Sequence, residues 1–207
     1  MNNYNIYIMP VITIDGNIGS GKSTILENLQ KNHNQVVSFE PIQEWEPYLE
    51  NMYKNNIGHF DLQLKVYLDR AFIQAKSNSI LYMERSPKFT FETFIKVYKD
   101  NLTQQDNSIL EYLYENVDHK YNKNVVEPVI YIYLQSSPTI CYNRIKQRDR
   151  ESEKTIDFNL IQLLHSKHEE CYDNINTKEG LPTFKINVDD KTPDEIAELI
   201  INYVQGN

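Results

Sequence analysis

The feature that most constrains the fold is a glycine-rich octapeptide near the N-terminus, Gly16-Asn17-Ile18-Gly19-Ser20-Gly21-Lys22-Ser23. It fits the pattern GxxxxGK[ST], follows an apolar run at residues 11–14 and precedes a helical pattern at residues 24–30. A loop of this kind, between a strand and a helix, turns successive backbone N–H groups toward phosphate oxygens. A chance glycine-rich turn is the alternative, but the flanking strand and helix count against it. The sequence therefore predicts a phosphate-binding loop.

Two side chains of the octapeptide have predicted partners. Lys22 can reach the β and γ phosphates of a nucleotide, and the Ser23 hydroxyl can contact Mg²⁺. The backbone from Gly16 to Thr24 would hold the phosphates, so we expect ATP and Mg²⁺ as ligands. Kinases, GTPases, motor ATPases and nucleotide-binding regulators all use such a loop, so it does not select among them.

The rest of the chain alternates strand and helix patterns. Apolar runs predict five strands at residues 11–14, 36–39, 80–83, 129–134 and 183–188. Helical spacing joins Leu62, Val66, Ala71 and Ile73, and again Ile109, Leu110, Leu113 and Val117. This alternation predicts an α/β fold with a five-stranded parallel sheet and helices on both faces. At 207 residues we expect one domain, 1–207, with a lid at about 144–156.

Charge and composition exclude several classes of protein. Lys and Arg number 21 against 29 Asp and Glu, and the resulting charge of -8 repels nucleic acid. No run of eighteen apolar residues exists and no secretory signal is present, so we expect no membrane partner and a cytoplasmic protein. Cys141 and Cys171 lack metal or redox spacing and are expected to be packing residues.

Carboxylates at two predicted strand ends are candidates for catalysis. Glu40 follows the second strand, and Glu84-Arg85 follows the third. In an α/β sheet, ligands bind at the carboxyl ends of the strands, so these residues would face the phosphate-binding loop. Glu40 could accept the proton of an attacking hydroxyl, although a surface glutamate is the alternative. Glu84 and Arg85 would serve Mg²⁺ and phosphate, although they could also form a structural ion pair.

Three arginines lie in the predicted lid. Arg144 and Arg148 share one helical face, and Arg150 would cap that helix at its junction with a loop. Guanidinium groups near a phosphate-binding loop would neutralise charge on a transferring phosphoryl group. A solvated basic face paired with Glu151 and Glu153 is an equal alternative. The sequence has no guanine-reading Asn-Lys-x-Asp motif, which leaves kinases of small acceptors as the leading class.

Read together, these residues resemble the deoxyribonucleoside kinase family, with its deoxycytidine, deoxyguanosine and mitochondrial thymidine kinases. The similarity extends over nearly the whole chain, and its markers keep the family's order: Gly16 to Ser23, Glu40-Pro41 with Trp45, Met52-Tyr53-Lys54, Gln63, Glu84-Arg85-Ser86, and Arg144-x-x-x-Arg148-x-Arg150 followed by Glu153. The resemblance implies a P-loop kinase fold of three layers with an arginine-rich lid, and transfer of the ATP γ-phosphate to a nucleoside 5′-hydroxyl.

The resemblance also implies roles for individual residues. Glu40 would be the general base, Arg85 would hold the 5′-hydroxyl and phosphate, and Glu84 would support Mg²⁺ beside Ser23. Tyr53 and Glu153 match the pair that binds the 3′-hydroxyl, Gln63 the residue that pairs with the base, and Phe94 the aromatic stacked on it. Asp189 and Asp190 match a loop that touches the adenine of ATP. The substrate-binding set is completed by Trp45, Met52, Val66, Arg70 and Thr90.

The base-reading positions conflict. In cytosine- and guanine-preferring members an arginine and an aspartate close over the base; here Arg70 fits the arginine, but Thr90 replaces the aspartate. Val66 and Thr90 are closer to thymidine-accepting relatives, which have an apolar residue at position 70. We expect a pyrimidine deoxyribonucleoside as substrate. Pro87 also departs from the animal enzymes, so the helix after Ser86 is expected to begin differently.

Two other functions stay open, a thymidylate-kinase-like nucleoside monophosphate kinase and a non-catalytic nucleotide-binding regulator. A glutamate at position 40 would repel an acceptor phosphate, and a regulator has no need for it. Apolar stripes on the helices at 62–75 and 109–117 could pair two chains, so we expect a homodimer whose ligands are a nucleoside and ATP.

Overall fold

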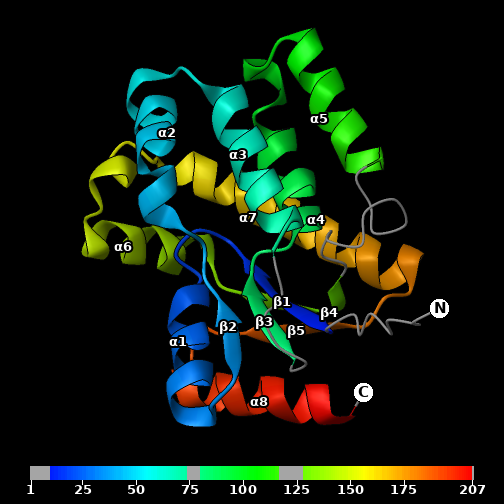
Figure 1. The fold of residues 1–207 in the computed structure, drawn as a ribbon. Coiled ribbons are helices and arrows are strands. Elements are labelled where there is room, and N and C mark those ends of the chain that lie inside the picture. The colour runs from blue at the N-terminus through cyan, green and yellow to red at the C-terminus, as the bar shows by residue number, and fades with distance from the viewer. Residues whose placement is uncertain (1–9, 74–79, 117–127, 207) are drawn as a thin grey trace, which may run out of the picture.

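The computed structural model describes residues 10–73, 80–116 and 128–206 (Figure 1). Five parallel strands form one sheet in the order β2-β3-β1-β4-β5. They are β1 (Val11–Gly16), β2 (Val36–Ser38), β3 (Leu81–Glu84), β4 (Pro128–Gln135) and β5 (Thr183–Asn187). The predicted parallel α/β sheet is confirmed.

The helices connect these strands. They are α1 (Lys22–His33), α2 (Ile42–Asn55), α3 (His59–Ala71), α4 (Pro87–Phe89), α5 (Gln104–Asn116), α6 (Pro138–Arg148), α7 (Phe158–Asn174) and α8 (Pro193–Gly206). Shorter turns are the π-helical η1 (Thr90–Ile95) and η4 (Ile175–Glu179), and the 3₁₀ turns η2 (Lys99–Asn101) and η3 (Glu151–Glu153).

One face of the sheet is covered by α1 and α8, which contact each other; in Figure 1, α8 lies below the strands and α1 lies to the left of β2. Successive strand side chains point to opposite faces, so Ile12 and Ile14 on β1 share this face. They pack against Leu29 of α1 and Ile200 of α8, both fully buried. This apolar layer anchors the helix that begins with Lys22.

The other face carries the remaining helices, with α2, α3 and α5 above the sheet in Figure 1. Tyr131 and Tyr133 of β4 point to this side and pack with Phe89 and Cys171. Cys141 belongs to a separate buried cluster with Ile161. Both cysteines are buried and free, which confirms their predicted packing role.

The order of the strands positions the site. β1 lies in the middle, with β3 on one side and β2 beyond it, so the segments that follow these three strands are neighbours at the carboxyl edge. These segments are the glycine-rich loop, the residues from Phe39 to Glu40, and the turn at Arg85. Ligand crevices of α/β sheets form at this edge.

Several predicted boundaries are wrong. Phe39 and Val188 lie outside β2 and β5, because sheet pairing stops at Ser38 and Asn187. Helix α3 ends at Ala71 because Phe72 leaves the helical conformation, with φ at -110° and ψ at 43°, so Ile73 is not helical. The end of that predicted helix, at 74–75, and Val117 lie outside the described residues.

The predicted lid begins inside α6, which carries both Arg144 and Arg148, as expected. Arg150 does not cap this helix. Asp149 does, because it takes the left-handed conformation (φ 47°) that ends the helix, and Arg150 is extended before η3. Within the described parts of the chain, no helix is both long enough and apolar enough to cross a bilayer.

Candidate active site

The phosphate-binding loop joins β1 to α1 and depends on two glycines in the left-handed region. Gly19 has φ 80° and Gly21 has φ 96°. A Cβ atom on Gly19 would lie 2.5 Å from the carbonyl oxygen of Cys141, so the loop packs directly against the backbone of α6. Only glycine meets both the conformational and the spatial requirement here.

Lys22 is folded back over this loop. Its Nζ atom donates to the carbonyl oxygens of Gly16 at 3.1 Å and Asn17 at 3.0 Å. Burial, and then the nearby Arg85 cation, lower the pKa of Lys22 to about 8. A bound phosphate would raise the pKa of Lys22 again, because an anion beside a buried ammonium group favours its charged form.

A cavity of about 580 Å³ opens over the loop. Most predicted site residues line it: Ile18, Gly19, Gly21, Lys22, Ser23, Thr24, Glu40, Trp45, Met52, Tyr53, Gln63, Val66, Glu84, Arg85, Phe94, Arg144, Arg148, Arg150 and Glu153. The predicted residues that do not line it are Gly16, Asn17, Ser20, Arg70, Thr90, Asp189 and Asp190. The cavity thus joins residues from four separate stretches of sequence.

Three charged side chains meet at the strand ends beside the loop. Arg85 Nε donates to Glu40 Oε1, and both side chains are more than nine-tenths buried. Glu84 Oε2 accepts from the backbone N–H of Glu40 at 3.2 Å, and Glu84 Oε1 accepts from Ser23 Oγ at 2.8 Å. A continuous hydrogen-bonded chain therefore runs from the phosphate-binding loop to the Glu40–Arg85 pair.

The two carboxylates have opposite pKa shifts. Burial raises the pKa of Glu40, but the Arg85 and Lys22 cations and the hydrogen bond from Arg85 outweigh burial and hold it below its usual value. Burial and the neighbouring Glu40 charge raise the pKa of Glu84. The neighbouring cations therefore favour the ionised form of Glu40, which is the form that a proton acceptor needs.

Arg85 has a left-handed backbone, with φ 61°. For a residue with a Cβ atom this conformation costs about 1–2 kcal/mol, so neighbouring hydrogen bonds must hold it. Arg85 N donates to Ile14 O at 3.0 Å, and the next amide, Ser86 N, donates to Asp15 Oδ1 at 2.8 Å. Asp15 is fully buried, and burial raises its pKa to about 6.

The segment after Arg85 forms the aromatic wall of the cavity. Ser86 Oγ accepts from Phe89 N at 3.0 Å, and α4 begins at Pro87. The chain continues as the π-helical η1, which carries Phe94 into the cavity wall. The Arg85 guanidinium lies 4.1 Å from the centre of the Phe94 ring.

Gln63 and Met52 both line the cavity. Gln63 is 3% exposed, and its Nε2 donates to Met52 Sδ at 3.8 Å. A thioether is a weak acceptor, so the Gln63 amide keeps donor and acceptor capacity for a ligand. The surrounding walls are apolar, from Trp45, Leu62 and Val66.

The lid arginines divide into two groups. Arg144 Nη1 donates to the carbonyl oxygens of Gly19 and Ser20, both at 3.4 Å. Arg148 instead makes a bidentate pair with Glu153, at 2.7 and 2.6 Å, and Arg150 Nη1 donates to the same carboxylate at 3.0 Å. Arg148 and Arg150 thus pair with an acidic residue, as the alternative expected, whereas Arg144 lies against the phosphate-binding loop.

Arg70 and Thr90, the two positions with conflicting substrate signals, do not reach the cavity wall. Arg70 is 3% exposed, and its Nη1 donates to Phe39 O and Glu84 O. Thr90 Oγ1 donates to Ser86 O at 2.9 Å. Both side chains are turned toward backbone carbonyls and away from the cavity lining.

Asp189 and Asp190 also lie off the cavity. Asp189 accepts from Ser136 Oγ at 2.6 Å and from Ser137 N at 3.1 Å, where it holds the start of α6. Asp190 is exposed.

Sequence reasoning missed several residues. Ile42, Leu49, Leu62 and Gln147 line the cavity without belonging to any motif. His168 of α7 is fully buried and meets the Phe94 ring edge-on at 5.8 Å. Asp15 directly precedes the glycine-rich loop, and its position at the end of an apolar strand is the one signal that could have identified it.

Ser23 Oγ and Glu84 Oε1 form the oxygen pair that fits Mg²⁺. This ion is bound by few protein oxygens, because it keeps several water ligands and coordinates substrate phosphates. Among the described residues, no group of three or more His, Cys, Asp or Glu side chains could hold a metal. A two-residue site beside the loop has the composition expected for a magnesium ion carried by a nucleotide.

Comparisons with known proteins agree with this geometry. The sequence profile of the deoxynucleoside kinase family matches residues 12–206. The probable deoxycytidine kinase of fowlpox virus is 32% identical over 197 residues, which cover 86% of this chain and 78% of that protein. Human mitochondrial thymidine kinase 2 is 29% identical over 175 residues, 77% of this chain and 63% of that protein. A deoxyadenosine kinase from M. mycoides, solved with bound dCTP, superimposes with a TM-score of 0.76 at 29% identity, covering 95% and 100% of the two chains.

Proposed function

The chain belongs to the deoxynucleoside kinase family, and from this premise we propose that it transfers the γ-phosphate of ATP to the 5′-hydroxyl of a pyrimidine deoxyribonucleoside. The observation that carries this proposal is the buried Glu40–Arg85 pair, which faces the same cavity as Lys22. A base, a cation that can hold an oxygen, and a phosphate cradle then share one 580 Å³ space.

Glu40 is the proposed general base. Its lowered pKa keeps it ionised, and its bond from Arg85 fixes its position. Glu40 takes the proton of the 5′-hydroxyl as the oxygen attacks the γ-phosphorus, and Arg85 holds that oxygen in line. An acceptor that already carried a phosphate would bring that charge close to the Glu40 carboxylate, so this end of the cavity favours an uncharged acceptor.

At the donor end the loop amides and Lys22 bind the phosphates, and Arg144 lies beside the loop. Ser23 and Glu84 would hold Mg²⁺, which when bound neutralises charge on the β and γ phosphates. Arg148 and Arg150 are proposed to stabilise the charge that spreads over the phosphoryl group. Asp189 and Asp190 remain proposed contacts to the adenine.

The sugar and base have separate proposed contacts. Tyr53 and Glu153, which both line the cavity, bind the 3′-hydroxyl, and Glu153 keeps free lone pairs for this while it pairs with the lid arginines. Gln63 pairs with the edge of the base, which stacks against Phe94. The names of the relatives include deoxycytidine, thymidine and deoxyadenosine kinases, so family membership leaves the base open. Apolar walls from Trp45, Met52 and Val66, with one amide, favour a pyrimidine.

The test is a phosphorylation panel. Initial rates with ATP and thymidine, deoxycytidine, deoxyadenosine or deoxyguanosine give kcat/KM for each, and phosphorus NMR identifies the phosphorylated oxygen. We expect 5′-monophosphates, with a pyrimidine preferred. A preference for either purine would reject the base assignment, and no turnover of any nucleoside would favour a nucleotide-binding regulator.

We also propose a homodimer. Ile109 and Tyr112 of α5 are 46% and 65% exposed, and these apolar side chains offer a surface for a second copy. Sedimentation at micromolar concentration should give twice the monomer mass, and a monomer would reject this assembly.

A further inference from the structure

Arg70 is a buried cation for which the proposed reaction has no direct use. It lies in the last turn of α3, and it does not line the cavity. Its Nη1 atom donates to two backbone oxygens, Phe39 O at 3.3 Å and Glu84 O at 3.2 Å. One side chain thus joins the carboxyl ends of β2 and β3.

The two carbonyls that accept from Arg70 belong to the residues directly before Glu40 and Arg85. The carbonyl of Phe39 shares a peptide group with the N–H of Glu40, and the carbonyl of Glu84 shares one with the N–H of Arg85. A single guanidinium nitrogen therefore bridges the peptide groups that precede the proposed base and its cationic partner. Because a peptide group is planar, fixing its oxygen also restricts the residue that follows it.

Both peptide groups are also held on their opposite sides. Glu40 N donates to Glu84 Oε2 at 3.2 Å, and Arg85 N donates to Ile14 O at 3.0 Å. Each peptide plane is hydrogen-bonded through its oxygen and its nitrogen. The Arg70 guanidinium donates to the carbonyl oxygen of both peptide groups, so it links the two strand ends.

The left-handed backbone of Arg85 requires this support. A non-glycine residue with φ 61° persists only where its surroundings fix it. Arg70 holds the peptide before Arg85, and the Asp15 carboxylate holds the peptide after it. The turn that directs the Arg85 side chain toward Glu40 is therefore restrained on both sides.

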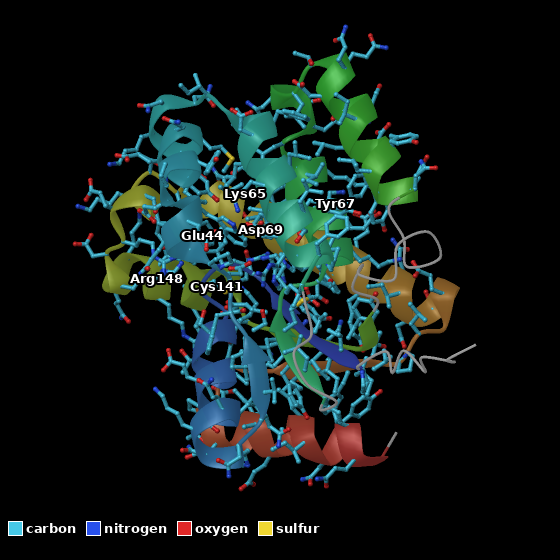
Figure 2. The ribbon with its side chains drawn as sticks, viewed as in Figure 1. Glu44, Lys65, Tyr67, Asp69, Cys141 and Arg148 are labelled. Atoms are coloured by element: carbon cyan, nitrogen blue, oxygen red, sulfur yellow. The ribbon has the colours of Figure 1, made fainter. Side chains whose placement is uncertain are left out.

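Neighbouring side chains hold Arg70 in place. Its guanidinium lies 5.5 Å from the centre of the Trp45 ring, whose Nε1 donates to Asp69 Oδ2 at 2.7 Å. Lys65 pairs with the same carboxylate at 2.6 Å, and Figure 2 shows Lys65, Asp69 and Glu44 close together on α3 and α2. Trp45 lines the cavity and Arg70 does not, so the indole is the part of this cluster that a base can contact.

We propose that Arg70 is a positioning residue, which sets the geometry of the Glu40–Arg85 pair by bridging the Phe39 and Glu84 carbonyls and does so whichever base is bound. This inference rests on the proposed function. It assigns to Arg70 a role in the rate of the reaction and none in the choice of nucleoside.

The experiment compares Arg70→Met, Arg70→Lys and the control Lys31→Met, which removes an exposed cation of α1 that pairs with Glu27. For Arg70→Met we expect kcat to fall roughly a hundredfold, the loss that a displaced reacting group can cause. The factor should be equal for thymidine, deoxycytidine and deoxyadenosine, with a smaller loss in Arg70→Lys and none in Lys31→Met. Unchanged kcat with a changed ratio of kcat/KM between nucleosides would overturn the proposal and assign base reading to Arg70.

A second readout does not depend on activity. Met is similar to Arg in length and apolar, so Arg70→Met fills much of the same space without the guanidinium group. In a crystal structure of Arg70→Met we expect the Arg85 turn to change and the Glu40–Arg85 bond to open; if Arg70→Met does not fold, Arg70→Lys gives the same comparison. An unchanged turn would overturn the inference. Absence of kinase activity in the unaltered protein would reject the proposed function, while the geometry of the turn would still test Arg70.

Discussion

The two ends of the cavity are built in different ways. The phosphate end is one contiguous segment, Gly16 to Thr24, which offers mainly backbone groups and one lysine. The nucleoside end collects side chains from α2, α3, η1 and η3, and its catalytic pair is held by hydrogen bonds from α3 and β1.

At the phosphate end a sequence motif determines the role of each residue, whereas at the nucleoside end tertiary packing determines it. At the phosphate end, φ angles and close contacts leave few choices of residue. At the nucleoside end the type of residue does not determine its role, because Arg70 and Arg148 are both arginines near a reacting site, yet one bonds backbone carbonyls and the other a carboxylate. Changes at the two ends should therefore have effects of different kinds.

The largest expected effect is at the catalytic pair. Glu40→Gln removes the base but keeps an oxygen for Arg85, and kcat should fall by about 10²–10⁴. The dissociation constant for ATP, measured by calorimetry, should not change, because Glu40 belongs to the nucleoside end. Glu44→Gln, an exposed carboxylate on the adjacent helix, is the control. A weakened ATP affinity in Glu40→Gln would contradict the separation of the two ends.

The phosphate end should respond to a single added carbon. In Gly19→Ala the new Cβ would lie 2.5 Å from Cys141 O at a φ of 80°, and a clash of about 1–3 kcal/mol corresponds to a roughly 5- to 150-fold loss of ATP affinity. Gly180→Ala is a close control, since Gly180 has φ 64° and no atom within 4 Å of its Cβ position. Equal ATP affinity in both variants would show that the contact with α6 does not shape the loop.

The wall behind Phe94 should be sensitive to acid. His168 is fully buried, and burial lowers its pKa to about 3, far below the 6.5 of a free histidine. Between these values the unfolded chain binds a proton that the folded protein does not, so stability is lost as pH falls below about 6.5, by at most about 1.4 kcal/mol per pH unit.

Thermal unfolding at pH 6.5 and 5.5 measures this loss. His168→Phe keeps an aromatic ring against Phe94 and should show a smaller decrease in Tm between pH 6.5 and 5.5. The control is His33→Phe, which replaces a histidine at the end of α1. An equal decrease in Tm in the unaltered protein and in His168→Phe would show that His168 does not cause the loss of stability.

The smallest effect is expected at Thr90. Its hydroxyl bonds to Ser86 O outside the cavity wall, so Thr90→Val should leave the ranking of nucleosides by kcat/KM unchanged. Val66→Thr exchanges the same two groups at a position that lines the cavity, and it should alter that ranking. A changed ranking in Thr90→Val alone would mean that this residue reads the base.

The two ends of the cavity also differ in how much of them the sequence predicts. The loop, the parallel sheet and the strand-end positions of Glu40 and Glu84 were predictable, because they depend on local pattern and on the rule that parallel strands end at one edge. The side-chain directions of Arg70 and Thr90, and the Asp15 contact to Ser86, were not. They depend on which backbone oxygens and amides remain unpaired after the helices have packed, and a sequence pattern contains no such information.

The central claim is that the nucleoside end accepts an uncharged hydroxyl because the Glu40 carboxylate lies there. The most direct test is a competition in one tube, with equal thymidine and thymidine monophosphate and ATP labelled at the γ-phosphate. The account predicts that the label appears in thymidine monophosphate. Label found mainly in thymidine diphosphate would contradict it, because the acceptor would then carry a phosphate into the space beside Glu40.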